Sequence, residues 1–450
     1  MSKPMDPQEL AQSAIKWATA AGSPQSCVTF TEEDNFQVRF ANSQITLYNV
    51  NKVRGFSVYL AKRRKRIVGA TTNPTPDSLK AFVERLARVC DSSPPGQDYV
   101  AFPEIKYTYR KNPNNDPHIE SEDLVGLAEA AIDESIRAGA QRVAGSLNAQ
   151  RVKLFFYNSN GLQASDEYTK VLLNVRAFAG ENASGHGLSC ASFISDFHPE
   201  EAGRTAGEYA KSSVNPSVPA EGVYRVLMSP TVVANTLPLV QNSSAYLIQH
   251  GRSFLDTGSI GRVMGPSMLS VEDHGFIEHG VGGRVFDDEG TPTRGKAVFS
   301  KGVFQTMIHN LTTSRKFSTI STGNAGVVNP VAYTVQFGAG NSSFDEMVKE
   351  TKQGILVTNN WYTRYQNTRT GEYSTMPRDA AYMIVDGKIA QPIAGFRLSD
   401  AVPRQVSAVK MASKERKWIE WWEVHTPTFA PWMLVDGMRV TVAFGAENKA

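Results

Sequence analysis

The sequence of 450 residues predicts an α+β fold, and two observations indicate it. In residues 1–220, helical patterns alternate with strand patterns whose connections are too short for parallel crossovers, which predicts antiparallel meanders. Beyond residue 220, β character dominates and one clear helix, 343–353, interrupts it. We therefore expect an N-terminal α+β region followed by a mainly antiparallel β domain, barrel- or sandwich-like.

Helical periodicity places four helices in the N-terminal region. The first begins after Asp6, a suitable N-cap, and Gly22 follows its end. The other three are expected at 76–90, 121–138 and 199–213. Strand patterns lie between them at 27–31, 36–40, 45–50, 53–60, 66–70, 151–157 and 169–180.

These elements predict two similar helix-plus-meander halves, about 1–92 and 117–220. The intervening segment 93–116 is rich in Pro, Asn and Asp and is expected to be a linker. Segment 214–222 contains two prolines and a glycine, so we place the main boundary there, between domains 1–220 and 221–450.

The C-terminal domain is expected to begin with a strand at 224–228 and a helix at 229–241. Asp386-Gly387 predicts a tight turn between two short strands. Further strand candidates are 281–286, 296–299, 302–309, 331–337, 382–385, 388–392 and 438–444.

Composition excludes several functional classes. A net charge of +3 gives no support to an electrostatic nucleic-acid binder, and the basic run 62–66 favours a hairpin turn over a phosphate-binding patch. The sequence offers no stretch of about 18 apolar residues for a membrane span, and MSKPMDPQEL does not resemble a secretory signal. We therefore expect a cytoplasmic protein.

Cysteine and histidine spacing gives no strong site. Cys27, Cys90 and Cys190 fit neither a disulfide framework nor a zinc ribbon. The densest donor cluster runs from Glu272 to His279. Its glycines predict a solvated loop, with a metal site using His274 and His279 as the weaker alternative.

The most informative segment is 282–326. It contains the acidic triplet Asp287-Asp288-Glu289, which runs into Gly-Thr291-Pro, and it ends in Ser321-Thr-Gly-Asn-Ala-Gly. The carboxylates can act in acid/base chemistry or hold a metal, or they can accept hydrogen bonds from turn amides. Composition alone favours the turn.

Two blocks in this segment, VFDDEGTPTR (285–294) and STGNAG (321–326), resemble the TldD/PmbA family, and weaker similarity spans nearly the whole chain. The resemblance implies a heterodimeric metallopeptidase that degrades or trims peptides. In that family, the TldD-type subunit alone holds zinc, through a His-Glu-x-x-x-His helix and a C-terminal cysteine. The PmbA/TldE-type subunit lacks these ligands.

This chain is similar to the PmbA/TldE type. Its corresponding helix, 231–244, has no His or Glu, Pro238 would distort it, and no cysteine follows Cys190. The resemblance implies a non-catalytic, substrate-shaping subunit for unfolded or modified peptides, with zinc in a TldD-type partner. The alternatives are an independent peptidase with relocated metal ligands and a regulatory binding protein.

We expect the substrate cavity near two loops, 287–291 and 319–326. The residues placed there are Asp287, Asp288, Glu289, Thr291, Thr322 and Asn324. Trp418, Trp421 and Trp422 have near-helical spacing, and the sequence leaves open whether they pack in the core or anchor an interface.

Overall fold

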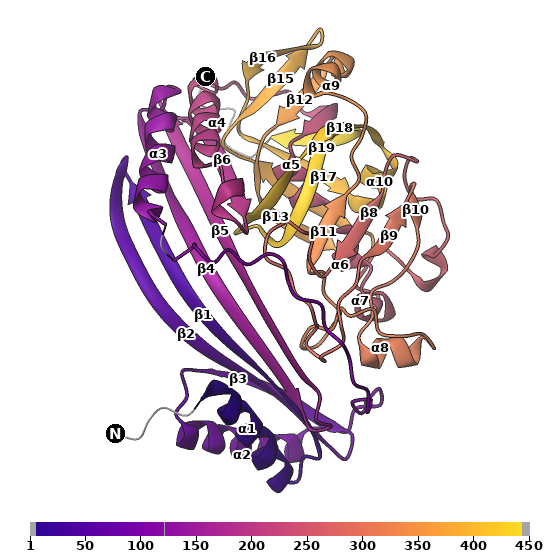
Figure 1. The fold of residues 1–450 in the computed structure, drawn as a ribbon. Coiled ribbons are helices and arrows are strands. Elements are labelled where there is room, and N and C mark those ends of the chain that lie inside the picture. The colour runs from indigo at the N-terminus through magenta and orange to yellow at the C-terminus, as the bar shows by residue number, and fades with distance from the viewer. Residues whose placement is uncertain (1–5, 121, 443–450) are drawn as a thin grey trace.

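The computed structural model describes residues 6–120 and 122–442, and it confirms the α+β class. Two large sheets carry the fold. A long, curved N-terminal sheet lies beside a C-terminal β region (Figure 1). None of the helices in the described residues is long and apolar enough to cross a membrane.

The N-terminal sheet is antiparallel, with strand order β3-β2-β1-β4-β5-β6. Three of its strands are much longer than predicted. The strand Arg142–Asn158 begins well before the predicted 151–157, and each of the other two joins two predicted segments. No Gly or Pro interrupts either polar join, and Glu32 on one strand pairs with Lys52 on the other. The strands are β1 (Gln25–Ala41), β2 (Gln44–Lys62), β3 (Lys65–Thr72), β4 (Arg142–Asn158), β5 (Gln163–Ala179) and β6 (Ala183–Ala191).

The two helix-plus-meander halves share this one sheet. β1 pairs with β4 continuously from Cys27↔Asn158 to Phe40↔Gly145, so backbone hydrogen bonds cross between the halves. The sequence pattern shows each meander but not this long-range pairing.

Helices cover the two ends of the sheet (Figure 1). α1 (Pro7–Ala20) and α2 (Pro76–Ser92) pack at one end, and α3 (Leu124–Arg137) and α4 (Pro199–Ser212) at the other. Asp6 caps α1 as expected, since its side chain accepts the Gln8 amide.

The C-terminal sheet is mainly antiparallel, as predicted, with parallel pairing of β7 with β12 and of β11 with β19. Its strands are β7 (Gly222–Met228), β8 (Val271–His274), β9 (Lys296–Ser300), β10 (Val303–Phe304), β11 (Thr334–Phe337), β12 (Gly354–Val357), β13 (Asn360–Asn367), β14 (Glu372–Pro377), β15 (Ala381–Val385), β16 (Lys388–Pro392), β17 (Phe396–Ala401), β18 (Val409–Trp421) and β19 (Val424–Val442). Positions 443–444 of the last predicted strand lie outside the described residues.

The C-terminal helices are more numerous than predicted. The expected helix at 229–241 is two pieces, α5 (Pro230–Thr236) and α6 (Leu239–Asn242), because the chain leaves helical geometry at Leu237 and Pro238. α9 (Phe344–Thr351) matches its prediction. Additional short helices are α7 (Ala245–Gln249), α8 (Leu311–Lys316) and α10 (Val402–Ser407), with 3₁₀ turns at Ile194–Asp196 and Thr257–Ser259.

Two further strand predictions were wrong, since 281–286 contains no strand and only Val303–Phe304 of the predicted 302–309 is one. Segment 281–286 is a loop and not a strand, since Gly282 and Gly283 have φ of 58° and 107°. The three tryptophans, whose role the sequence left open, lie on β18 and its turn. Trp418 stacks on Phe429 and Trp421 is buried, whereas Trp422 is 47% exposed.

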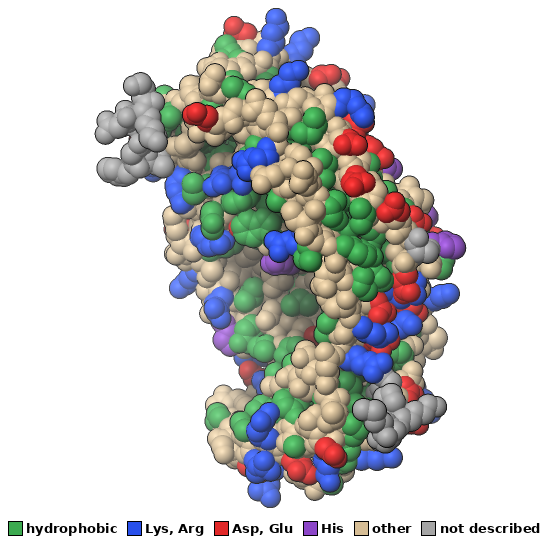
Figure 2. Space-filling view, turned by 90° about the vertical axis from the view of Figure 1, so that its left-hand side faces the viewer, with side chains coloured by type: hydrophobic (Ala, Val, Ile, Leu, Met, Phe, Trp, Pro, Cys, Tyr) green, Lys and Arg blue, Asp and Glu red, His purple; other side chains and the backbone are tan. Residues whose placement is uncertain are grey.

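The basic run 62–66 forms the predicted β2–β3 hairpin turn. Its side chains bind neighbouring segments: Lys62 pairs with Asp91, and Arg64 donates to the Gln97 carbonyl. One side of the molecule is hollowed at mid-height, with hydrophobic side chains in the hollow and Lys and Arg side chains around it (Figure 2).

Candidate functional site

Asp287 organises the acidic turn. Its side chain is fully buried, and one carboxylate oxygen accepts the amides of Glu289 and Thr291 at 2.9 Å each. The other oxygen accepts the Ala325 amide at 2.9 Å, which ties this turn to the second loop. Burial raises the pKa of Asp287, while the three amides favour its ionised form. Asp287 and Thr291 therefore build the turn.

Asp288 and Glu289 interact with other groups than Asp287 does. Asp288 pairs with Arg284 at 2.6 Å, and its own amide donates to the Ala325 carbonyl. Glu289 accepts the Leu311 amide at 2.8 Å at the start of α8. Burial, followed by the negative charge of Asp287, raises the pKa of the Glu289 carboxyl.

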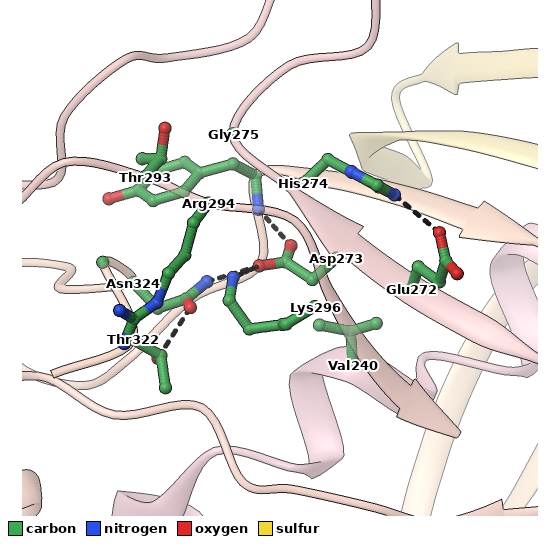
Figure 3. Close-up of polar contacts among 12 residues, drawn as sticks. Val240, Glu272, Asp273, His274, Gly275, Thr293, Arg294, Lys296, Thr322 and Asn324 are labelled. Atoms are coloured by element: carbon green, nitrogen blue, oxygen red, sulfur yellow. Dashed lines mark hydrogen bonds and ion pairs between the residues drawn. The ribbon is translucent and has the colours of Figure 1, made fainter. Parts of the chain in front are cut away.

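Thr322 and Asn324 belong to a separate buried network around Asp273 on β8 (Figure 3). The Asn324 amide donates to Asp273 Oδ2 at 2.6 Å, and Lys296 Nζ lies 2.7 Å from the same oxygen. Thr322 donates to Asn324 Oδ1 at 2.8 Å, and the Tyr333 amide donates to Asp273 Oδ1 at 3.1 Å. The network holds the 319–326 loop against the C-terminal sheet.

A cavity of about 550 Å³ lies beside the acidic turn, between the N-terminal sheet and the loops of the C-terminal region. Cys27 and Thr29 of β1, with Tyr59 of β2, line it from the sheet. Leu311 of α8 and Val328 line it from the other side. The cavity falls within the size range of small-ligand pockets, about 300–1000 Å³.

The structure divides the six predicted cavity residues into two groups. Asp288 and Glu289 line the cavity, with Gly326 at the end of the second loop. Asp287, Thr291, Thr322 and Asn324 do not line it and hold the loops in place instead. The predicted turn role of the triplet thus holds for Asp287, while the carboxyl groups of Asp288 and Glu289 line the cavity wall.

The histidine cluster does not converge on a common point. His274 Nε2 lies 2.9 Å from Glu272 on the same strand (Figure 3), and exposed His279 contacts Asp196 at 2.9 Å. Across residues 6–120 and 122–442, no three His, Cys, Asp or Glu side chains are grouped closely enough to hold a metal.

Sequence reasoning missed several residues of the cavity wall. Arg284 and Arg66 line it, and so does Asp98 in the predicted linker. The linker is bound to the acidic loop, since Tyr109 donates to the Gly290 carbonyl at 2.7 Å and Asn114 donates to the Gly282 carbonyl at 2.9 Å. Its high content of Asn and Tyr was the available signal.

Cys27 is a buried thiol in the cavity wall. Burial, with added effects of Glu289 and Asp288, raises its pKa well above the usual value. A thiol held in its protonated form is a poor nucleophile, so the cavity has no activated cysteine there.

Family models match three consecutive parts of the chain. They are the PmbA/TldA metallopeptidase domain 1 over residues 28–90, the central domain over 114–214 and the C-terminal domain over 221–442. The chain belongs to the PmbA/TldD metallopeptidase family. The resemblance carried by 285–294 and 321–326 is thereby confirmed.

Relatives in this family are distant in sequence. Metalloprotease PmbA of Escherichia coli O157:H7 is 22% identical over 87% of this chain and 88% of its own length. A metalloprotease PmbA homologue of Buchnera aphidicola is 33% identical, but the match spans only 30% of this chain and 28% of that relative.

Solved structures share the fold. TldE from Thermococcus kodakarensis superposes with a TM-score of 0.83 and 16% identity, covering 96% of this chain and 100% of that one. A Thermotoga maritima protein, described as a candidate modulator of a DNA gyrase, gives 0.82 and 23% identity, covering 96% and 100%.

Proposed function

We propose that this family member is a non-catalytic subunit that shapes peptide substrates for a zinc-bearing, TldD-type partner. The observation that carries the proposal is the helix where the resemblance implies zinc ligands. It breaks at Pro238, its first piece, α5, is almost wholly buried, and it contains no His, Cys, Asp or Glu. Nothing on it can generate a zinc-bound hydroxide.

The peptide would bind in extended form. Residues 44–53 of β2 hydrogen-bond with β1 alone among the described residues, because β3 pairs only from Gly55 onward. This free edge carries exposed Leu47, Tyr48 and Val50. Backbone pairing at a free edge holds peptides of diverse sequence, and we assign that role to the edge in the heterodimer.

Activity of the assembled pair tests the proposal. The chain is expressed alone and with a TldD-type partner, and both are assayed for cleavage of an unfolded peptide with zinc added. We expect cleavage by the pair only. Equal cleavage by the chain alone would overturn the proposal and favour relocated metal ligands.

Two substitutions probe the cavity. Asp288→Ala should lower cleavage by the pair several-fold without preventing assembly, because it removes a carboxylate from the cavity wall. Asn324→Ala should also lower cleavage, by releasing the loop held to Asp273. Glu278→Ala, at an exposed position, is the control. Unchanged turnover in both variants would contradict this assignment of the cavity.

A further inference from the structure

The charged side chains of the 550 Å³ cavity differ in whether they are neutralised. Asp288 is paired with Arg284 at 2.6 Å, and Asp98 lies 3.7 Å from Lys316. Glu289 and Arg66 also line the cavity, but neither forms an ion pair with any residue that the structure describes. The cavity therefore holds one carboxyl and one guanidinium without a partner of opposite charge.

These two groups come from different domains, and each contacts the start of α8. Glu289 comes from the acidic turn of the C-terminal region and uses one oxygen to accept the Leu311 amide. Arg66 comes from β3 of the N-terminal sheet, at an exposed position, and within 6–120 and 122–442 its side chain donates to Thr312 Oγ1 alone, at 3.3 Å. Each retains hydrogen-bonding capacity for a ligand.

The groups share one electrostatic environment. Arg66 favours the ionised form of Glu289, and both groups shift the pKa of Tyr59, which lines the same cavity. They are nevertheless too far apart to neutralise each other by direct contact. A ligand carrying an ammonium at one end and a carboxylate at the other would pair with both.

The remaining walls suit a peptide backbone and small side chains. Thr29, Thr31 and Ser57 line the cavity from β1 and β2, and their hydroxyls make no side-chain hydrogen bond to another described residue. Val327 and Val328, 53% and 61% exposed, supply an apolar surface opposite.

We propose that this cavity binds a short zwitterionic peptide, with its terminal ammonium at Glu289 and its terminal carboxylate at Arg66. The inference rests on the proposed function, because such peptides are the products that a peptidase releases. The cavity would capture a short product and not an internal stretch of a long chain. Burial raises the pKa of the Glu289 carboxyl. A cation bound beside it favours the ionised carboxylate and offsets that effect.

Calorimetry on the chain alone tests the inference, without partner or zinc. The probes are trialanine, N-acetyl-trialanine and trialanine amide. We expect each blocked peptide to bind wild-type protein about tenfold or more weakly than trialanine, since each loses one charge-assisted contact. Alanine side chains carry no charge, so the termini alone are compared.

Two variants test which residue binds each end of the peptide. Glu289→Gln keeps an acceptor for the Leu311 amide and should abolish the preference for a free amino end while keeping that for a free carboxylate. Arg66→Gln should do the reverse. If Glu289→Gln does not fold, Glu289→Asp replaces it and should weaken trialanine more than N-acetyl-trialanine.

Three results would overturn the inference: no binding of trialanine at millimolar concentration, equal binding of all three peptides, or variants that keep both preferences. Because no cleavage is measured, these results are separate from the test of the proposed function. If trialanine binds but this chain has no effect on peptide cleavage by a partner, the proposed function is rejected and peptide binding in the cavity is retained.

Discussion

At the residue scale, neighbouring carboxylates of one acidic triplet have different tasks. Both carboxylate oxygens of Asp287 accept hydrogen bonds from backbone amides, so this residue fixes the turn. Asp288 and Glu289 instead line the cavity wall. Carboxylates that look alike in sequence are distinguished by burial and by the donors around them.

Removing the Asp287 carboxylate should destabilise the fold. In Asp287→Ala, three amides near a buried position lose their acceptor, and each unsatisfied buried donor costs about 1–3 kcal/mol. We expect the free energy of unfolding to fall by roughly 3 kcal/mol or more in urea titrations. Asp133→Ala, at an exposed position of α3, should change it by less than about 0.5 kcal/mol. A small effect of Asp287→Ala would show that water replaces the carboxylate.

Glu289 should make stability depend on pH. Its pKa is raised in the folded state, so the folded protein retains a proton that the unfolded chain releases above about pH 4.3. The contribution is present below that pH and is lost as pH rises toward the folded pKa. Glu289→Gln should therefore flatten the loss of stability between about pH 5 and pH 8, with a gain of about 1 kcal/mol or more at the upper end.

The measurement is urea unfolding across this pH range, with Glu278→Gln as the exposed control. In the control, the free energy of unfolding should change with pH as it does in the wild type. Parallel pH profiles for wild type and Glu289→Gln would show that the Glu289 carboxyl is not desolvated in the folded protein.

At the element scale, periodicity predicted most helices and strands, while long-range pairing could not be predicted from it. Helical stripes located α2 and α9 within a few residues. The same local patterns split β1 and β2 into shorter segments, because the polar runs 32–35 and 51–52 resemble turns in sequence. The pairing of β1 with β4, and the meeting of Arg66 with Glu289 at one cavity, join segments more than a hundred residues apart.

Close packing of α4 against α3 depends on a glycine. The sequence shows this glycine, but only the structure shows why a larger residue would not fit there. A Cβ at Gly203 would lie 2.2 Å from the Ala131 carbonyl oxygen of α3. Gly203→Ala should therefore force the two helices apart and lower the free energy of unfolding by about 2 kcal/mol or more. Gly55→Ala is the matched control, since its Cβ would meet Thr31 at an ordinary 3.9 Å. Equal stability of the two variants in urea titrations would contradict the close approach of α3 and α4.

At the scale of the whole molecule, exposed aromatic surface is a candidate docking site for the proposed partner. Trp422 is 47% exposed and its ring lies 5.2 Å from that of Trp361 and 6.4 Å from that of Tyr362, measured between centroids. Trp421, the adjacent residue, is buried in the core. The sequence left the role of these tryptophans open, and burial separates them: Trp421 packs in the core, and Trp422 remains available for an interface.

Trp422→Ala should weaken assembly with a TldD-type partner and leave the isolated chain folded. Exposed aromatic anchors commonly contribute about 2 kcal/mol or more at an interface, which corresponds to roughly a thirtyfold change in dissociation constant. Sedimentation analysis of the mixed subunits measures this change, and unfolding of the chain alone measures stability. Val263→Ala, at a 75% exposed apolar position, should alter neither. If Trp422→Ala assembles as tightly as wild type, the aromatic patch lies outside the interface.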